Sequence, residues 1–395
     1  MDKRGYKSGL NHKSLALLAL FMFFLRIAQG REEMTEQIPT ASPSPSRVPE
    51  FRNSLRRICL SILFGILTGL LSAVLFACLV SLVLRYMSRT PVLKGPVIFT
   101  PKIDPKTLQL ALSTDNHQLI GSSHNGKYYR VVLDGGVAFA VKRLEPFEKG
   151  CPEIESKSVK RRIQQELEML AGLKHRNLMS LRAYFREPIC LSLVYDYIPT
   201  GSLEDAMNRV RENQLRLSWE VRHRIAVGVI KGLQHLHFSC SPRVLHHNLK
   251  PTNIMLDPEY EPLLSDIGLA KLTPNLGTRA SSYTAPECFQ NCRYTDKSDI
   301  FSFGIILGVL LTGRDPLDPF FGEGAGGGSL VRWLRHLQQA GEALEALDKS
   351  ILGEEGEEDE MLMAVRIAVV CLSDLPADRP SSDELVPMLT QLHSF

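Results

Sequence analysis

The sequence lacks a strong excess of either charge and lacks any cluster of cysteines, and each absence excludes a class of protein. Its 395 residues include 46 Lys and Arg against 43 Asp and Glu, a formal net charge of +3. No basic stripe with interleaved aromatic side chains occurs, so nothing predicts a nucleic-acid partner. Cys288 and Cys292 lie four residues apart without a second pair of metal ligands, which argues against a zinc site.

Residues 31–57, which lie between two apolar runs, also contain few side chains that could form a hydrophobic core. Residues 31–57 are rich in Pro, Ser, Thr and charge, a composition that predicts a short disordered stub. They contain no cysteine, no leucine-rich repeat and no N-x-S/T acceptor. Such a stub is too short to form a ligand-binding domain. If the protein takes part in perceiving an extracellular signal, another chain must bind the ligand.

Residues 1–30 have the outline of a cleavable signal peptide. Basic residues come first, the apolar run Leu15 to Leu25 follows, and the small residues Ala28 and Gly30 come last. The alternative is a retained anchor helix, but eleven apolar residues are short for a bilayer that needs roughly 20. We therefore expect entry into the endoplasmic reticulum and cleavage near Gly30.

Residues 58–84 form an uncharged, mostly apolar run bounded by Arg57 and Arg85, long enough for one transmembrane helix. Basic residues lie on both sides, so the positive-inside rule does not set the orientation. Cleavage of the leader would set it, because the amino terminus would then lie outside the cell. We expect a single-pass type I protein whose remaining chain is cytosolic.

Small residues recur at every fourth position of this apolar run. On a helix such a row lets a second backbone approach closely, which predicts a seam for a partner helix. The alternative is that Gly, Ala and Ser are simply frequent in membrane spans. The seam consists of Gly65, Gly69, Ala73, Ala77 and Ser81.

Residues 85–115 are basic and contain four prolines, at positions 91, 96, 101 and 105. This composition predicts a juxtamembrane linker that lies along the anionic inner leaflet. A solvated charged spacer with no specific role explains it equally well.

The segment Leu245 to Asn253, with the sequence LHHNLKPTN, resembles the catalytic loop of a protein kinase, whose pattern is H-R-D-x-K-x-x-N. In kinases the Asp accepts the proton of the substrate hydroxyl and the final Asn holds a magnesium ion. Here Asn248 replaces that Asp. A carboxamide has no basic lone pair at neutral pH, so we expect no kinase chemistry.

Further motifs in the same order give residues 116–395 a resemblance to the intracellular domain of plant leucine-rich-repeat receptor-like kinases. They are Ala140-Val141-Lys142, Ser265-Asp266-Ile267-Gly268, Ala285-Pro286-Glu287, Asp296 to Gly304, and Asp378-Arg379-Pro380. The resemblance implies an α+β, bilobal protein-kinase-like fold, with an N-lobe at 116–197 and a C-lobe at 198–395. It also implies an ion pair between Lys142 and Glu166, and between Glu287 and Arg379.

The resemblance implies a site for ATP and Mg²⁺, although two departures weaken it. Ser123 replaces the middle glycine of the glycine-rich loop, and Tyr128 stands where the family usually has a Val over the adenine. Asn253 and Asp266 are the expected metal ligands. The expected nucleotide-binding residues are Gly121, Gly126, Lys142, Glu166, Lys250, Asn253 and Asp266.

By this resemblance the protein is a pseudokinase of the plasma membrane that acts as an adaptor or co-receptor. Its expected partner is a leucine-rich-repeat receptor-like protein without its own kinase, in peptide perception that controls plant meristem size; other receptor kinases are further candidates. Two alternatives remain open. One is a low-turnover serine/threonine kinase, because positioning supplies most of phosphoryl-transfer catalysis. The other is a nucleotide-sensing switch.

Overall fold

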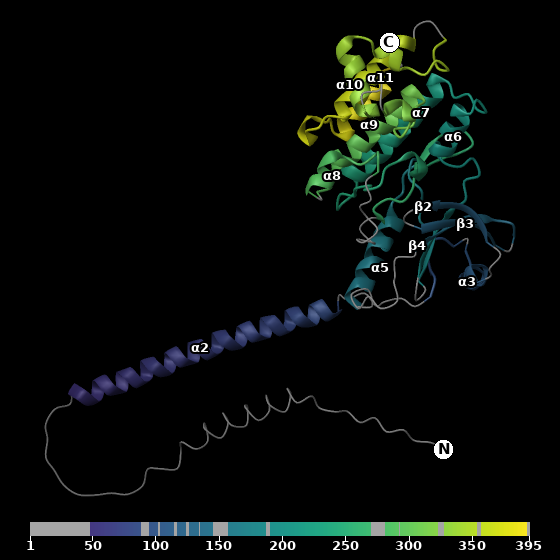
Figure 1. Ribbon diagram of the computed structural model, residues 1–395. Coiled ribbons are helices and arrows are strands. Elements are labelled where there is room, and N and C mark those ends of the chain that lie inside the picture. Colours follow the sequence, from purple (N-terminus) through teal and green to yellow (C-terminus); the bar gives the residue numbers. More distant parts are fainter. Residues whose placement is uncertain are drawn as a thin grey trace, which may run out of the picture. The chain divides into compact units, whose positions relative to one another are not determined.

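The computed structural model separates into two units, residues 1–89 and residues 90–395 (Figure 1). The predicted leader and most of the predicted stub lie outside the described residues. The structure describes residues 48–87, 95–101, 103–113, 117–123, 126–133, 135–144, 157–186, 190–269, 281–291, 293–322, 328–353 and 357–392.

The described part of the first unit is one long helix, α2, at Val48–Met87. Its segment Leu55–Val83 has a mean hydropathy of 2.6 and is long and apolar enough to span a membrane. The helix begins ten residues before the predicted span, so Val48 to Arg57 are helical where the sequence predicted disorder. Pro49 lies in the first turn, where proline is tolerated, and each further residue of a nucleated helix gains a hydrogen bond.

The N-lobe of the second unit contains an antiparallel sheet of six strands in the order β1-β5-β6-β4-β3-β2. Helix α5 at Lys157–Gly172 packs on the sheet through Ile163 and Leu167, which are buried with Leu191 and Leu193 of β6. The strands are β1 Val97–Ile98, β2 Gln118–Ser123, β3 Gly126–Val132, β4 Ala138–Leu144, β5 Ala183–Arg186 and β6 Leu191–Asp196.

The predicted linker is wrong for residues 95–101 and 103–113, which belong to the N-lobe. Strand β1 pairs with β5, and helix α3 at Pro105–Ser113 buries Leu108 and Leu112 in a core shared with Phe139 of β4. Asp104 caps α3, since its Oδ2 accepts from the backbone N–H groups of residues 106 and 107. Proline is favoured at the first helical position, so Pro105 directly after this cap starts the helix. The basic, proline-containing composition had predicted a linker here instead.

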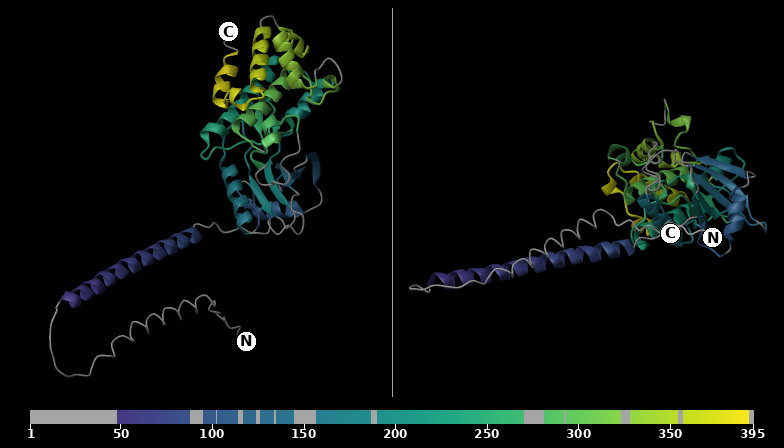
Figure 2. Two further views of the ribbon diagram at one scale, coloured as in Figure 1. Left: turned by 60° about the vertical axis from the view of Figure 1, so that its left-hand side comes forward. Right: turned by 90° about the horizontal axis from the view of Figure 1, so that it is seen from below.

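The C-lobe is helical and is built around α9 at Asp296–Thr312. Every residue from Ser298 to Thr312 is buried, as expected for a helix that is apolar on all sides. Figure 2 shows the blue sheet and the green and yellow helices as two separate layers of this unit. The other α-helices described here are α6 Leu203–Arg211, α7 Trp219–Gln234, α8 Pro286–Asn291, α10 Leu330–Ala340, α11 Glu357–Cys371 and α12 Ser382–Thr390.

Two short elements flank the end of the catalytic loop in the C-lobe. The hairpin of β7 Ile254–Leu256 and β8 Pro262–Leu264 follows the catalytic loop, and the one-turn helix η2 at Pro251–Asn253 precedes it. The α+β bilobal fold predicted from the motifs is confirmed.

The ion pair predicted between Glu287 and Arg379 is present. The Arg379 guanidinium, which is almost completely buried, donates from Nη1 and Nη2 to the two carboxylate oxygens at 2.7 and 2.9 Å. Burial by itself would raise the pKa of Glu287, but the hydrogen bonds and charge of Arg379 lower it below its usual value.

Candidate functional site: the catalytic loop and the nucleotide side

Strands β3 and β4 place Tyr128 and Lys142 directly opposite each other, on one face of the sheet. The Lys142 ammonium lies 4.8 Å from the centre of the Tyr128 ring, and Lys142 has no solvent-exposed surface. A buried ammonium needs a hydrogen-bonded anion, because water no longer solvates its charge.

Asp266 supplies that anion. Its Oδ2 accepts a hydrogen bond from Lys142 Nζ and another from the Tyr128 hydroxyl, the latter at 2.6 Å. Asp266 is 3% exposed and has a φ of 62°, which aspartate tolerates better than most residues. Burial lowers the pKa of Lys142 even though the charge and hydrogen bond of Asp266 raise it.

The predicted pair of Lys142 and Glu166 is wrong for this structure. Among the described residues, Lys142 forms its ion pair with Asp266, and Glu166 of α5 is partly exposed. The motif after α5 placed Glu166 on the correct helix. It could not predict the distance between α5 and β4, which depends on packing.

Hydrogen bonds of Asn253 hold the catalytic loop in place. Asn253, which is 2% exposed, donates from Nδ2 to the backbone oxygen of Asn248 at 2.7 Å. The backbone oxygen of Asn253 accepts from Ser265 N and Oγ, which ties the loop to the segment that carries Asp266. Asn248 and Lys250 are partly exposed.

A buried carboxylate on α9 holds the start of this loop. Asp299 accepts from the backbone N–H groups of His246 and His247 at 2.8 and 3.1 Å. It also contacts His237 Nε2 and the Tyr294 hydroxyl, each at 3.0 Å. Burial by itself would raise the pKa of Asp299, but the contact with His237 lowers it. Sequence reasoning noted Asp299 only as part of a helix motif and missed this role.

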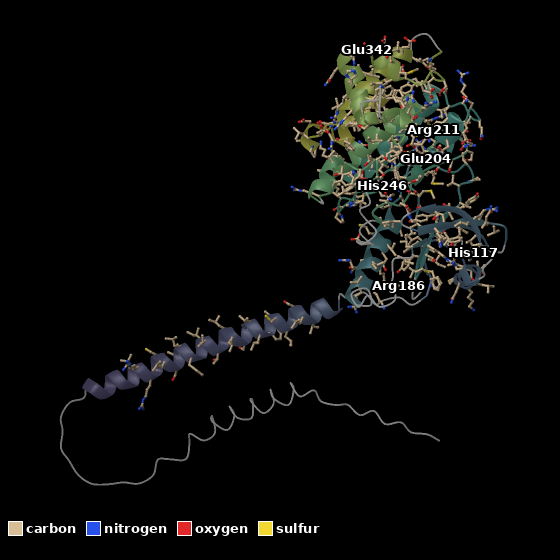
Figure 3. All side chains as sticks on the ribbon, viewed as in Figure 1. His117, Arg186, Glu204, Arg211, His246 and Glu342 are labelled. Carbon is tan, nitrogen blue, oxygen red and sulfur yellow. The ribbon has the colours of Figure 1, made fainter. Side chains whose placement is uncertain are left out.

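The two histidines of the loop have different surroundings. His246, labelled in Figure 3 on the part of the C-lobe nearest the sheet, is fully buried, and burial lowers its pKa. His247 has a φ of 66° and lies against Tyr294 in a tilted arrangement, with ring centres 4.3 Å apart. It stands where kinases have an arginine, and an imidazole is a weaker partner for phosphate.

Of the two predicted loop glycines, only Gly126 is required by the local backbone. Gly126 has a φ of 142°, and a side chain there would clash with the backbone oxygen of Arg143 in β4. A Cβ on Gly121 would meet only the Tyr128 ring, at an ordinary 3.9 Å. The residues between the two strands, 124 and 125, lie outside the described residues.

In this arrangement Lys142 and Asp266, the residues expected to hold the phosphates and the metal, are bonded to each other and to Tyr128. Mg²⁺ takes six oxygen ligands in near-octahedral geometry, and in nucleotide sites one or two protein carboxylates supply part of this set beside water and the phosphates. Oδ2 of Asp266 already carries two donors, and only Oδ1 is without a partner among the described groups. Lys142, which would hold the phosphates, is covered by the Tyr128 ring.

The predicted seam lies on α2 as one continuous row. All five of its residues are exposed, and a Cβ added at Gly65 or Gly69 would meet no atom within 4 Å. The neighbouring hydroxyls of Thr68 and Ser72 donate to carbonyls of their own helix, so they need no partner from elsewhere.

Comparison with known proteins agrees with this fold. The profile of the protein kinase domain matches residues 114–387. The chain is 65% identical to the "Inactive leucine-rich repeat receptor-like protein kinase CORYNE" of Arabidopsis thaliana, over 92% of this chain and 91% of that protein.

More distant relatives agree as well. The receptor-like serine/threonine/tyrosine-protein kinase SOBIR1 of Arabidopsis thaliana is 35% identical over 75% of this chain, which spans about half of that protein (49%). Among solved structures, the pseudokinase domain of BIR2, an immune regulator of the RLK/Pelle family, matches with a TM-score of 0.62 and 30% identity. It covers 79% of this chain and 93% of its own.

A relative named inactive and a neighbour that is a pseudokinase domain both agree with the prediction drawn from Asn248. The chain therefore belongs to the protein kinase family, and within it to the leucine-rich-repeat receptor-like kinases.

Proposed function

We propose that this protein is a membrane-anchored receptor-like pseudokinase, an adaptor or co-receptor of the plasma membrane. It pairs with a leucine-rich-repeat receptor-like protein that has no kinase, and it acts in peptide-ligand signalling such as meristem maintenance. The observation that carries the proposal is Asn248 at the proton-acceptor position of a folded kinase scaffold, in which the loop contact of Asp299 and the Glu287–Arg379 pair are in place.

The chemistry of Asn248 supports a role without phosphate transfer. A general base contributes on the order of 10²–10⁴ to a rate, and a carboxamide cannot supply it. The direct bond between Lys142 and Asp266 adds to this, because those groups position the phosphates and the metal in an active kinase. What remains is a folded surface that other proteins can bind.

The test of catalysis is incorporation of labelled phosphate by the full-length chain in detergent micelles. We expect none above buffer, with or without added substrate protein. Activity that disappears in an Asp266→Ala variant would instead establish a low-turnover serine/threonine kinase.

Pairing through α2 is supported by the seam, since Gly65 and Gly69 leave open space on the helix surface. We expect Gly69→Leu to reduce co-precipitation of leucine-rich-repeat receptor-like proteins from plant membranes by about tenfold, which corresponds to roughly 1.4 kcal/mol. The matched control is Leu71→Phe, which adds bulk at an exposed position away from the row. An equal loss in both variants, or in neither, would contradict pairing through this seam.

A further inference from the structure

We propose that Tyr128, Lys142 and Asp266 form a permanent lock in place of the nucleotide and its metal, and that removing the Tyr128 ring opens the site to an adenine nucleotide. This group of three side chains is called the Tyr128 lock below. The inference is independent of the pairing proposed above, because it concerns only what the kinase-like domain can bind.

The first step is the position of the ring. Tyr128 and Lys142 are register partners in β3 and β4, so their side chains leave the sheet side by side. The ring lies against the ammonium, 4.8 Å from its centre, on the surface where the family has a smaller valine. A phosphate that is to reach Lys142 must first displace this ring.

The second step is the anchor of the ring. The Tyr128 hydroxyl donates to Asp266 Oδ2 at 2.6 Å, within the range of strong hydrogen bonds to carboxylates. This bond links residues 138 positions apart in sequence, one on β3 and one in the segment after β8. A phenylalanine at this position could fill the space but could not make the link.

The third step is competition for the charged groups. Lys142 is fully buried and Asp266 is 3% exposed, and they neutralise each other directly. A nucleotide would have to break a buried ion pair and separate its charges before gaining any contact. An ordinary kinase presents these groups to the phosphates and to magnesium.

A second tyrosine, Tyr195, lies within range of the charge of Asp266. Tyr195 of β6 lies opposite Ala140 of β4, in the strand position that leads to the hinge. Burial raises the pKa of Tyr195, and the nearby charge of Asp266 raises it further.

The experiment measures binding of a fluorescent ATP analogue with Mg²⁺ to the full-length chain in detergent micelles. We expect no saturable binding to the natural chain up to about 1 mM, and at least tenfold tighter binding to Tyr128→Val. Tyr128→Val combined with Lys142→Met should lose the gain, because the phosphates then lack their cation. Tyr128→Phe keeps the ring but lacks the hydroxyl that bonds to Asp266. Its affinity for the analogue should lie between those of the natural chain and Tyr128→Val.

Two outcomes would overturn the lock. One is binding to the natural chain as tight as to Tyr128→Val. The other is a folded Tyr128→Val variant that still binds nothing. Should Tyr128→Val fail to fold, the midpoint of thermal unfolding of the natural chain decides. A rise of this midpoint with ATP and Mg²⁺ would reject the lock, and an unchanged midpoint would support it. Binding by Tyr128→Val without phosphate transfer would confirm the lock and leave the proposed function intact.

Discussion

The nucleotide side and the C-lobe scaffold both contain buried ion pairs between residues of the family's motifs. The scaffold pair is the one expected in the family, and the pair on the nucleotide side is not. In the scaffold, Arg379 and Glu287 make the contact expected of any kinase. On the nucleotide side, Lys142 and Asp266 are kept, but they bind each other and Tyr128. The residues that stabilise the fold make the contacts expected in the family. The residues that would bind a ligand contact other side chains of this chain instead.

The strongest test of this comparison is Arg379→Ala. The guanidinium makes four hydrogen bonds, to Glu287 and to the backbone oxygens of Lys297 and Ser373, and an arginine cannot give up its charge. Removing it should lower the free energy of unfolding by about 3–5 kcal/mol. Urea unfolding followed by tryptophan fluorescence measures this, because Trp219 and Trp333 both lie in the C-lobe.

The control for Arg379 is Arg176→Ala, which removes an exposed ion pair with Glu261 at 3.4 Å. Exposed pairs are worth roughly 0–1 kcal/mol, so this variant should unfold almost as the natural chain does. Equal losses for the two arginines would contradict the structural role assigned to Arg379.

A smaller loss is expected for Asp266→Asn. It removes the anion beside Lys142, but a lysine can release its proton when it is buried without a partner, so the cost should be about 1–3 kcal/mol. We expect the loss to be local. Hydrogen exchange should accelerate in the amides of β3 and β4 and stay unchanged in α9. Acceleration in α9 of equal size would mean that the two regions are not separable.

The dependence on pH sharpens the comparison further. The folded-state pKa values of Glu287 and Asp299 lie below their usual values of 4.5 and 3.8, so both carboxylates contribute stability at neutral pH. This contribution is lost as the pH falls through the folded-state values. The difference in free energy of unfolding between the natural chain and Glu287→Gln should therefore be constant near pH 7 and narrow below about pH 4.5. A constant difference down to pH 3 would contradict this account.

The smallest expected effect is that of Asn248→Asp by itself. Restoring the carboxylate should leave phosphate incorporation undetectable, because the Tyr128 lock still occupies Lys142 and Asp266. Combined with Tyr128→Val, the same change should add a measurable rate, within the 10²–10⁴ range of a general base. Full activity from Asn248→Asp alone would show that one residue separates this chain from a working kinase.

Much of the scaffold could be predicted from local patterns. The order of the motifs predicted both lobes, and the motif from Asp296 to Gly304 lies in the buried helix α9. The row of small residues on α2 followed from a spacing of four. The linker prediction was wrong for residues 95–101 and 103–113 because this segment contains few apolar residues. That Leu108 and Leu112 belong to a core follows only from their packing on β3 and β4.

The sequence by itself determined the missing proton acceptor, since the identity of Asn248 settles its chemistry wherever the loop lies. Only the tertiary structure decided which groups bind Lys142. Asp266 and Glu166 are both carboxylates far from it in sequence, and the choice between them depends on how α5 and the segment after β8 pack against the sheet. The bond from Tyr128 to Asp266 likewise spans 138 positions, and no local pattern specifies a contact over such a separation.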